Sequence, residues 1–414
     1  MIRYTDYMKI TSIIAREILD SRGNPTVYAI VTLDSGASGE ASVPSGASTG
    51  TYEALALPAA KAIKNVNETL AEALIGKDAD AQAEIDQTMI ALDGTSDKSK
   101  IGANAILGVS LACARAAANE HKVPLYKYLA EIGAFTQKLI MPVPLMNIIN
   151  GGVHADWATD IQEYMIMPIG AKSFSEALDM GSKTYQALNH ILGEKTTLGD
   201  EGGFVPESKN NEAPFELILK AIEQAGYKPG VDISLAIDSA ASEWYKNGQY
   251  HLKKDGPKDA AKLIEWYESL VKKYPLISIE DPFGEDDWQS WIALTAKLSE
   301  TQIVGDDLYV TNQSRLERGI QEKASTAILV KPNQIGTLSE TIDTIKLAQK
   351  NNIKVIISHR SGETTDDFIA DLAVACGCGQ IKAGAPGPKE RMAKYKRLVE
   401  IEGELGAEVK YYKF

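Results

Sequence analysis

The chain has 414 residues, of which 44% are hydrophobic and 24% are charged, and its formal net charge is −13. This composition is ordinary for a folded globular protein, so it excludes general disorder. The negative charge argues against nucleic acid as a bulk partner, and no stretch approaches the ~20 apolar residues of a membrane span. The length suits a barrel with a smaller second domain better than one ordinary core.

The N-terminal residues and the cysteines indicate the cellular location. The first ten residues, MIRYTDYMKI, lack the apolar stretch of a signal peptide. Cys113, Cys376 and Cys378 form no disulfide framework, and we expect them to be small buried hydrophobes. We therefore expect a cytoplasmic protein.

Residues 1–135 are predicted to form a smaller α+β domain. Segment 24–46 alternates and carries Gly/Ser turns, which predicts antiparallel strands. Segment 81–94 has apolar residues at helical spacing and ends on Gly94, a typical C-cap, and the Ala-rich segment 102–121 predicts a buried helix. The run PSGASTG (44–50) lacks the GK[ST] ending of a P-loop, so we interpret it as a mobile lid or a plain exposed loop.

Residues 140–414 are predicted to form a (β/α)8 TIM-type barrel that begins near segment 141–152. Six apolar runs each end on one ionisable residue, and successive endings lie 23 to 42 residues apart, the rhythm of strand-plus-helix units. The carboxyl ends of barrel strands meet at one rim, where such enzymes keep their chemistry. The residues at these ends are Asp238, Glu280, Asp306, Lys331, His359 and Lys382.

Three carboxylates in this series predict a metal site. Asp238, Glu280 and Asp306 follow consecutive strands, so we expect them to be neighbours. Carboxylates held a few ångströms apart repel, and a hard divalent cation such as Mg²⁺ is the usual remedy. The alternative is three independent N-caps or surface charges.

Two lysines follow later strands of the same series. A lysine near a metal and a second cation has a lowered pKa and can act as a general base, which is our interpretation of Lys331 and Lys382. The alternative for either lysine is an ion pair that closes the carboxylate cluster.

The segment SHRSGET (358–364) predicts an anion site. An arginine fork beside a hydroxyl, as in His359, Arg360 and Ser361, suits a phosphate group. A capped helix start would give the same pattern.

Two further segments carry acids. GDEGG (199–203) places Glu201 between glycines, and IQEYMIMP (161–168) places Gln162 and Glu163 on an apolar, strand-like run. An acid that faces a base across a bound substrate can release a leaving group from one face while the base removes a proton from the other. By pattern alone Glu201 could equally be a structural turn residue.

A dozen motifs in order, running nearly end to end, resemble the enolase family. The resemblance implies the enolase variant of the barrel with a smaller α+β N-terminal domain. It implies the reversible, Mg²⁺-dependent dehydration of 2-phospho-D-glycerate to phosphoenolpyruvate and water, and a homodimer or higher homo-oligomer. The motifs are REILDSRGNPTV, PSGASTG, GANAILGVSLA, MNIINGGVHAD, IQEYMI, GDEGG, DSAASEWY, SIEDPF, GDDLYVTN, ILVKPNQIGT, ISHRSGET and QIKAGAP.

The resemblance also implies residue roles. Lys331 would be the proton acceptor, and Glu201 the proton donor with Glu163 assisting. Two Mg²⁺ sites are implied, the second of which binds with substrate. The implied metal residues are Asp238, Glu280, Asp306 and, at the second site, Ser48, with Asp307 behind them. The implied substrate contacts are His154, Gln162, Glu163, Glu280, Asp306, Lys331, His359, Arg360, Ser361 and Lys382.

Two departures from the family's usual sequence favour a second hypothesis. The segment after Leu55 is about a dozen residues shorter than usual, and in the stretch KAGAPGP Ala383 replaces a threonine after Lys382 and an arginine is missing. A third departure is Trp157, which is bulkier than the usual residue. Enolases as a family also occur on cell surfaces, where they bind plasminogen or matrix proteins. The alternative function is therefore a divergent paralogue that acts mainly as a surface-binding protein.

Overall fold

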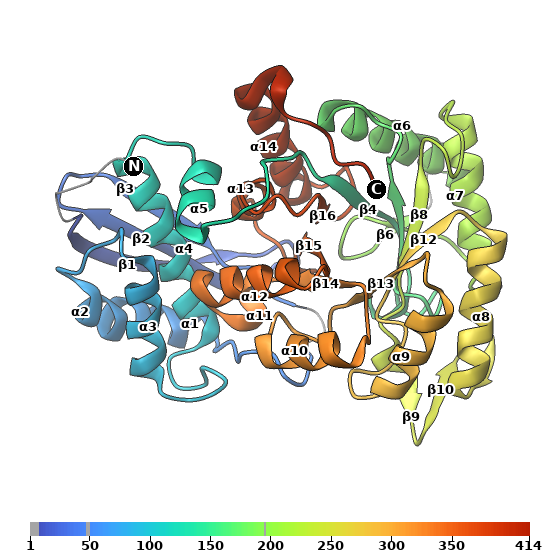
Figure 1. Ribbon diagram of the computed structural model, residues 1–414, viewed down its shortest axis with the longest axis horizontal. Coiled ribbons are helices and arrows are strands. Elements are labelled where there is room, and N and C mark those ends of the chain that lie inside the picture. Colours follow the sequence, from blue (N-terminus) through green and yellow to red (C-terminus); the bar gives the residue numbers. More distant parts are fainter. Residues whose placement is uncertain (1–7, 47–49, 194–195) are drawn as a thin grey trace.

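The computed structural model describes residues 8–46, 50–193 and 196–414. Its N-terminal part is an α+β domain, as predicted. Its strands form one antiparallel sheet in the order β1-β2-β3 (Figure 1). Gly94 caps α3 with a left-handed φ of 69°, which suits glycine. The elements are β1 (Ile10–Leu19), β2 (Pro25–Leu33), β3 (Ser38–Ser42), α1 (Ala59–Asn65), η1 (Val66–Leu70), α2 (Ala71–Leu74), α3 (Gln82–Asp93), α4 (Ala103–Glu120) and α5 (Leu125–Gly133).

Helix α4 packs across this sheet because its small side chains permit a close approach. Ala112, Cys113, Ala114, Ala116 and Ala117 are fully buried. A Cβ atom on Gly39 of β3 would lie 2.3 Å from the carbonyl oxygen of Ala112, so this contact needs glycine on the strand. The predicted buried helix is confirmed.

The C-terminal part is a closed barrel of eight strands. Strand β16 pairs with β4 and closes the sheet. All neighbouring barrel strands are parallel except β5, which is antiparallel to β4 and to β8. The barrel strands are β4 (Val143–Asn150), β5 (Glu163–Met167), β8 (Ser234–Asp238), β12 (Leu276–Glu280), β13 (Gln302–Gly305), β14 (Ala327–Val330), β15 (Lys354–Ser358) and β16 (Gln380–Lys382).

The reversed strand β5 follows from the length of its connection. A parallel return needs a crossover, usually a helix, but only loop 151–162 with the 3-10 turn η2 (Gly152–Ala155) joins β4 to β5. The chain then passes through two helices and a short hairpin before β8, which restores the common direction. The apolar run at 161–168 predicted a strand but not its direction.

Helices surround the barrel, and α12 packs against α3 and α4 of the N-terminal domain (Figure 1). The helices are α6 (Phe174–Leu192), α7 (Ala213–Gln224), α8 (Ala260–Lys273), α9 (Trp288–Lys297), α10 (Gln313–Glu322), α11 (Pro332–Ile335), α12 (Leu338–Lys350), α13 (Phe368–Ala375) and α14 (Lys389–Leu405). The short elements are β6 (Thr197–Leu198), β7 (Phe204–Val205), η3 (Ala241–Trp244), β9 (Tyr245–Lys246), β10 (Gln249–Leu252), β11 (Gly256–Lys258) and η4 (Gly406–Glu408).

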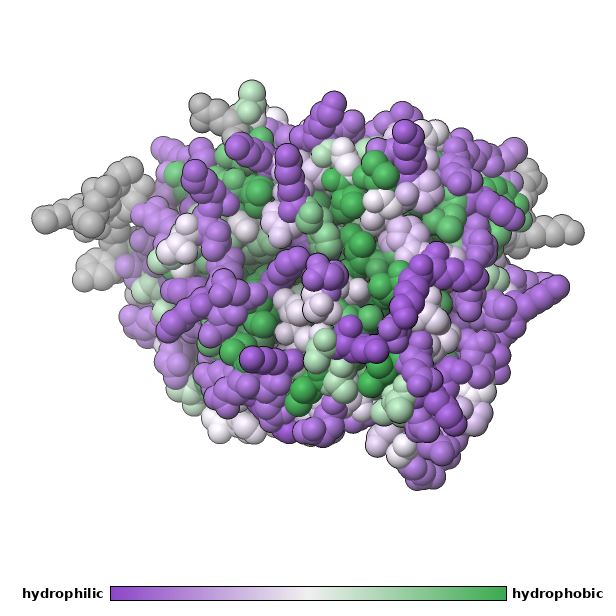
Figure 2. Space-filling model, turned by 45° about the vertical axis from the view of Figure 1, so that its right-hand side comes forward, coloured by the Kyte–Doolittle hydropathy of each residue, from purple (hydrophilic) through white to green (hydrophobic). Residues whose placement is uncertain are grey.

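Hydrophilic side chains cover most of the face in Figure 2, with hydrophobic residues gathered mainly near its centre. No helix in the described part of the chain is both long and apolar enough to cross a membrane. The three cysteines are buried and unpaired by disulfides, as expected. The exact division at residues 135 and 140 stays a prediction.

Candidate active site

The six strand-end residues lie at one rim of the barrel. Three of them are the last residues of β8, β12 and β16, and the other three directly follow β13, β14 and β15. Glu163 reaches this rim from the opposite direction, because β5 is antiparallel and begins there. A cavity of about 520 Å³, partly open to solvent, lies over the rim. The predicted site residues that line it are His154, Gln162, Glu163, Glu201, Asp238, Asp306, Lys331, His359, Arg360, Ser361 and Lys382.

Lys382 is a buried cation among three acids. Its Nζ donates to Glu280 Oε1 at 2.8 Å and Oε2 at 3.0 Å. The same Nζ lies 3.1 Å from Glu163 Oε2 and 3.4 Å from Asp238 Oδ2. Burial opposes its charge, but the attraction of Glu163 and Glu280 outweighs burial and raises the pKa of Lys382 well above its usual value. The ion-pair alternative left open by the sequence is therefore present for Lys382.

Lys331 also forms an ion pair, in this case with Asp306. Burial opposes the lysine charge, but the attraction of Asp306 outweighs it, so the pKa of Lys331 is raised. The sequence predicted a lowered pKa for a lysine beside a bound metal and a second cation, and for the metal-bound site that stays a prediction. Arg360 and Lys382 do act in the predicted direction, because their positive charges oppose a proton on Lys331.

Asp281, which the sequence analysis missed, holds the backbone of the next strand end. Its Oδ1 accepts from the N–H of Asp306 and its Oδ2 from the N–H of Asp307, both at 2.9 Å. Burial and repulsion by Asp307 raise the pKa of Asp281 well above its usual value. Gln334 adds a bond from Nε2 to Asp306 Oδ1 at 2.9 Å. Asp306 is thus fixed through its backbone and its side chain.

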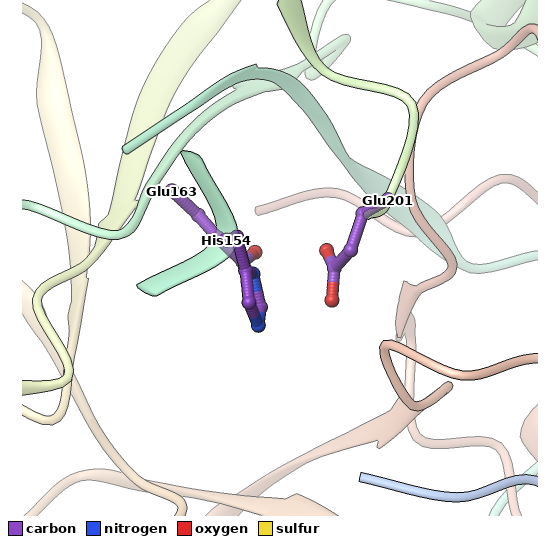
Figure 3. A group of neighbouring side chains, drawn as sticks. All are labelled: His154, Glu163 and Glu201. Carbon is purple, nitrogen blue, oxygen red and sulfur yellow. The ribbon is translucent and has the colours of Figure 1, made fainter. Parts of the chain in front are cut away.

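His154, Glu163 and Glu201 form a second group on the rim, and Figure 3 shows the Glu201 carboxylate turned toward the other two side chains. One ligand atom of each lies within 4.8 Å of the others. Burial and repulsion by Glu201 raise the pKa of Glu163, which favours a proton on this acid. Burial acts in the same direction on Glu201, but its interactions with His359 and His154 outweigh burial and lower the pKa of Glu201.

Arg391 of α14 holds the loop that carries His359, Arg360 and Ser361 through hydrogen bonds to its backbone. Arg391 Nη1 donates to the Arg360 carbonyl and Nη2 to the Ser361 carbonyl, both at 2.6 Å. No helix begins at this segment, since α13 starts only at Phe368, so the helix-start alternative is wrong. Burial lowers the pKa of His359 to about 4, so its ring is neutral near pH 7. Arg391 gave no local sequence signal, because its importance arises only from packing.

The loop that carries His154 has an unusual anchor. Lys253 Nζ lies 3.9 Å from the ring centroid of Trp157, and Asp160 accepts from the backbone N–H groups of Lys253 at 2.6 Å and Lys254 at 2.9 Å. The bulky Trp157 noted in the sequence thus packs against Lys253 in the β10–β11 turn, and the cavity lining includes His154 but not Trp157.

The donor set fits a hard cation. Within the described ranges, Gln162 Oε1 and His154 Nδ1 are buried atoms with no hydrogen-bond partner, and both side chains line the cavity. Buried polar atoms of this kind call for a ligand. The groups whose atoms lie closest are His154–Glu163–Glu201 and Asp281–Asp306–Asp307, so buried acidic clusters could hold a metal. Asp238, Glu280 and Asp306 instead contact the two lysines, and Ser48 lies outside the described residues.

Two known domain families match this chain. Residues 10–129 match the family described as the enolase N-terminal domain, and residues 138–413 match the enolase C-terminal TIM barrel domain. Together they cover nearly the whole chain, and they agree with the mixed eight-stranded barrel and with the N-terminal antiparallel sheet. The chain belongs to the enolase family.

Proposed function

We propose that this protein is an active enolase that converts 2-phospho-D-glycerate to phosphoenolpyruvate and water. One observation carries the proposal: a single cavity is lined by the buried Lys382 and the half-buried Lys331, by the two buried acids Glu163 and Glu201, and by an arginine beside a serine. A base, an acid and an anion-binding group around one cavity are what proton abstraction next to a carboxylate requires.

Each end of the substrate has a proposed partner. Lys382 neutralises the substrate carboxylate, and Arg360 with Ser361 holds the phosphate. Lys331 takes the proton from C2. When Asp306 is engaged as a ligand, Lys331 loses the attraction that raises its pKa, while Arg360 and Lys382 continue to oppose its proton.

Release of the C3 hydroxyl is assigned to the two acids. Glu201 gives a proton to the departing hydroxyl and Glu163 assists, with His154 and Gln162 beside them. His359, which is neutral and lies 3.4 Å from Glu201 Oε2 through its Nε2, supports this end of the site.

Asp238, Glu280 and Asp306 are the proposed holders of Mg²⁺, with Ser48 proposed for a second ion. Bound there, Mg²⁺ would supply positive charge that offsets the negative charge gained by the carboxylate when C2 loses its proton. The chain's own contribution is to keep these acids, Lys331 and Lys382 fixed before substrate arrives, so that little reorganisation accompanies the reaction.

The test is direct. Purified protein with Mg²⁺ and 2-phospho-D-glycerate should produce phosphoenolpyruvate, followed as rising ultraviolet absorbance, and EDTA should stop the reaction. Absence of turnover from folded protein at saturating Mg²⁺ would reject the proposal. We further propose that the protein is cytoplasmic and forms a homodimer or higher homo-oligomer, which a mass measurement in solution can check. Within each chain, the proposed domains are residues 1–135 and 140–414, and limited proteolysis can check this division.

The surface-binding alternative makes a different prediction. Plasminogen binding that survives in a Lys331→Ala variant without turnover would support it, because adhesion does not need the chemistry.

A further inference from the structure

Glu53 contacts Arg360 across the boundary between the two domains. Glu53 Oε2 accepts from Arg360 Nη1 at 2.9 Å, and Glu53 Oε1 accepts from Nη2 at 3.1 Å. A carboxylate that takes both terminal nitrogens of a guanidinium fixes the plane of the group as well as its position. Asn333 Oδ1 accepts from the same Nη1 at 3.0 Å, which fixes the plane from a second side.

This pair is buried and belongs to the cavity. The side chains of Arg360 and Glu53 are 4% and 8% exposed, and both residues line the cavity described above. Burial opposes the charge of Arg360, but the attraction of Glu53 outweighs it and raises the pKa of Arg360. Water screens the attraction within such a buried ion pair only weakly, so the two side chains are held firmly in place.

Glu53 also connects the arginine to two other parts of the site. Its Oε1 accepts from the backbone N–H of Gly50 at 3.0 Å and from Gln334 Nε2 at 3.4 Å. Gln334 donates through the same Nε2 to Asp306 Oδ1 at 2.9 Å, and its carbonyl accepts from the N–H of Ala54 at 2.8 Å. A single carboxylate therefore joins Arg360 to the strand end that bears Asp306.

We propose that Glu53 is a positioning residue, whose two oxygens orient the guanidinium of Arg360 for the phosphate group of the substrate. The proposal rests on the assignment of Arg360 to phosphate in the proposed function. Glu53 acts through Arg360 and does not itself touch the reacting atoms. Because its role is geometric, the negative charge alone is not sufficient; the length of the side chain matters as well.

Two substitutions separate geometry from charge. Glu53→Gln replaces one accepting oxygen with a donor that faces the guanidinium, and Glu53→Asp keeps the charge but shortens the reach by one methylene. A displacement of a binding group by about 1 Å can cost on the order of 10²-fold. We expect both variants to raise the Kd for inorganic phosphate, and the KM for 2-phospho-D-glycerate, by about 10-fold to 100-fold. The fall in kcat should be smaller than the rise in KM.

Arg115→Gln is the matched control, because Arg115 also forms an ion pair across the domain boundary, with Asp366, yet does not line the cavity. If Glu53 served only to join the domains, the Glu53 variants and Arg115→Gln would lower the melting temperature alike and leave the phosphate Kd unchanged. That outcome would overturn the proposal. Tighter phosphate binding in Glu53→Gln, or wild-type affinity in Glu53→Asp, would overturn it too.

Phosphate binding is measured by calorimetry on the full chain with Mg²⁺ present, with Arg360→Gln as the reference for loss of the anion contact. If Arg360→Gln leaves phosphate affinity unchanged, Arg360 is not the phosphate group's partner and the inference fails. A further outcome separates the two proposals. If the wild-type protein does not turn over substrate, the proposed function fails. If phosphate affinity nevertheless falls in Arg360→Gln and in both Glu53 variants, the inference about Glu53 stands.

Discussion

Glu163, the first residue of β5, lies directly opposite Asp238, the last residue of β8, in an antiparallel register. The start of one strand and the end of its neighbour therefore meet at the same rim. This relationship places Glu163, an acid with a raised pKa, beside Lys382. It also explains why Glu163 begins a strand although every other member of the rim series ends or follows one.

Lys331→Ala should lower kcat on the order of 10²-fold to 10⁴-fold, because a general base usually contributes that much. Steady-state assays with 2-phospho-D-glycerate measure the loss. Lys354→Ala is the control, since this exposed lysine begins β15 at the opposite end of the barrel and should leave kcat unchanged. Near-normal activity of Lys331→Ala would remove this residue from the mechanism.

Asp281→Asn should raise the Mg²⁺ concentration at which activity is half-maximal. The substitution leaves one oxygen for two backbone N–H groups that now share a carboxylate, so Asp306 shifts. Groups that orient a metal ligand typically change metal affinity by about 10-fold to 100-fold. A titration of activity against Mg²⁺ after EDTA treatment gives the half-saturating concentration. Asp343→Asn, on the exposed side of α12, should not change it, and an unchanged value for Asp281→Asn would contradict the prediction.

Gly151→Ala should disturb the loop that carries His154. A Cβ atom there would lie 1.9 Å from Thr159 Oγ1 and 2.2 Å from the Ile161 carbonyl oxygen. Overpacking of this kind costs about 1–3 kcal/mol of stability, and displacement of the loop should also raise KM. Gly403→Ala is the control, because its Cβ meets nothing within 4 Å and alanine favours helix α14. Thermal melts and KM values from both variants decide the matter.

The ion pair between Arg115 and Asp366 should make stability depend on pH. Burial raises the pKa of Asp366, but the attraction of Arg115 outweighs burial and lowers it. A carboxyl with a lower pKa in the folded chain contributes stability above its unfolded pKa of about 3.9, and this contribution disappears as pH falls through the folded value. Arg115→Gln should therefore cost about 3 kcal/mol at pH 7, the lower end for a buried pair, and progressively less below about pH 4. Urea unfolding at pH 7, 5 and 3.5 measures the difference between variant and wild type, and a constant difference would refute the assignment.

The rim itself could be predicted from the sequence, because each buried strand is a short apolar run and the residue at its end is fixed by register. The direction of β5 could not, since alternation and burial are the same for either direction. The two lysine ion pairs could be given only as an alternative to general bases, and the Glu53–Arg360 contact could not be predicted. Glu53 and Arg360 are 307 residues apart in the chain, and no local pattern encodes which distant side chains meet.

Strand β16 joins β4 through the pairing of Lys382 with Leu145, the last ladder needed to close the sheet. The cation that contacts Glu280 and Glu163 therefore lies on a strand that closes the ring. A chain in which β16 is unpaired would leave those acids without this lysine. Catalytic activity should consequently report an intact ring and not merely a normal content of secondary structure.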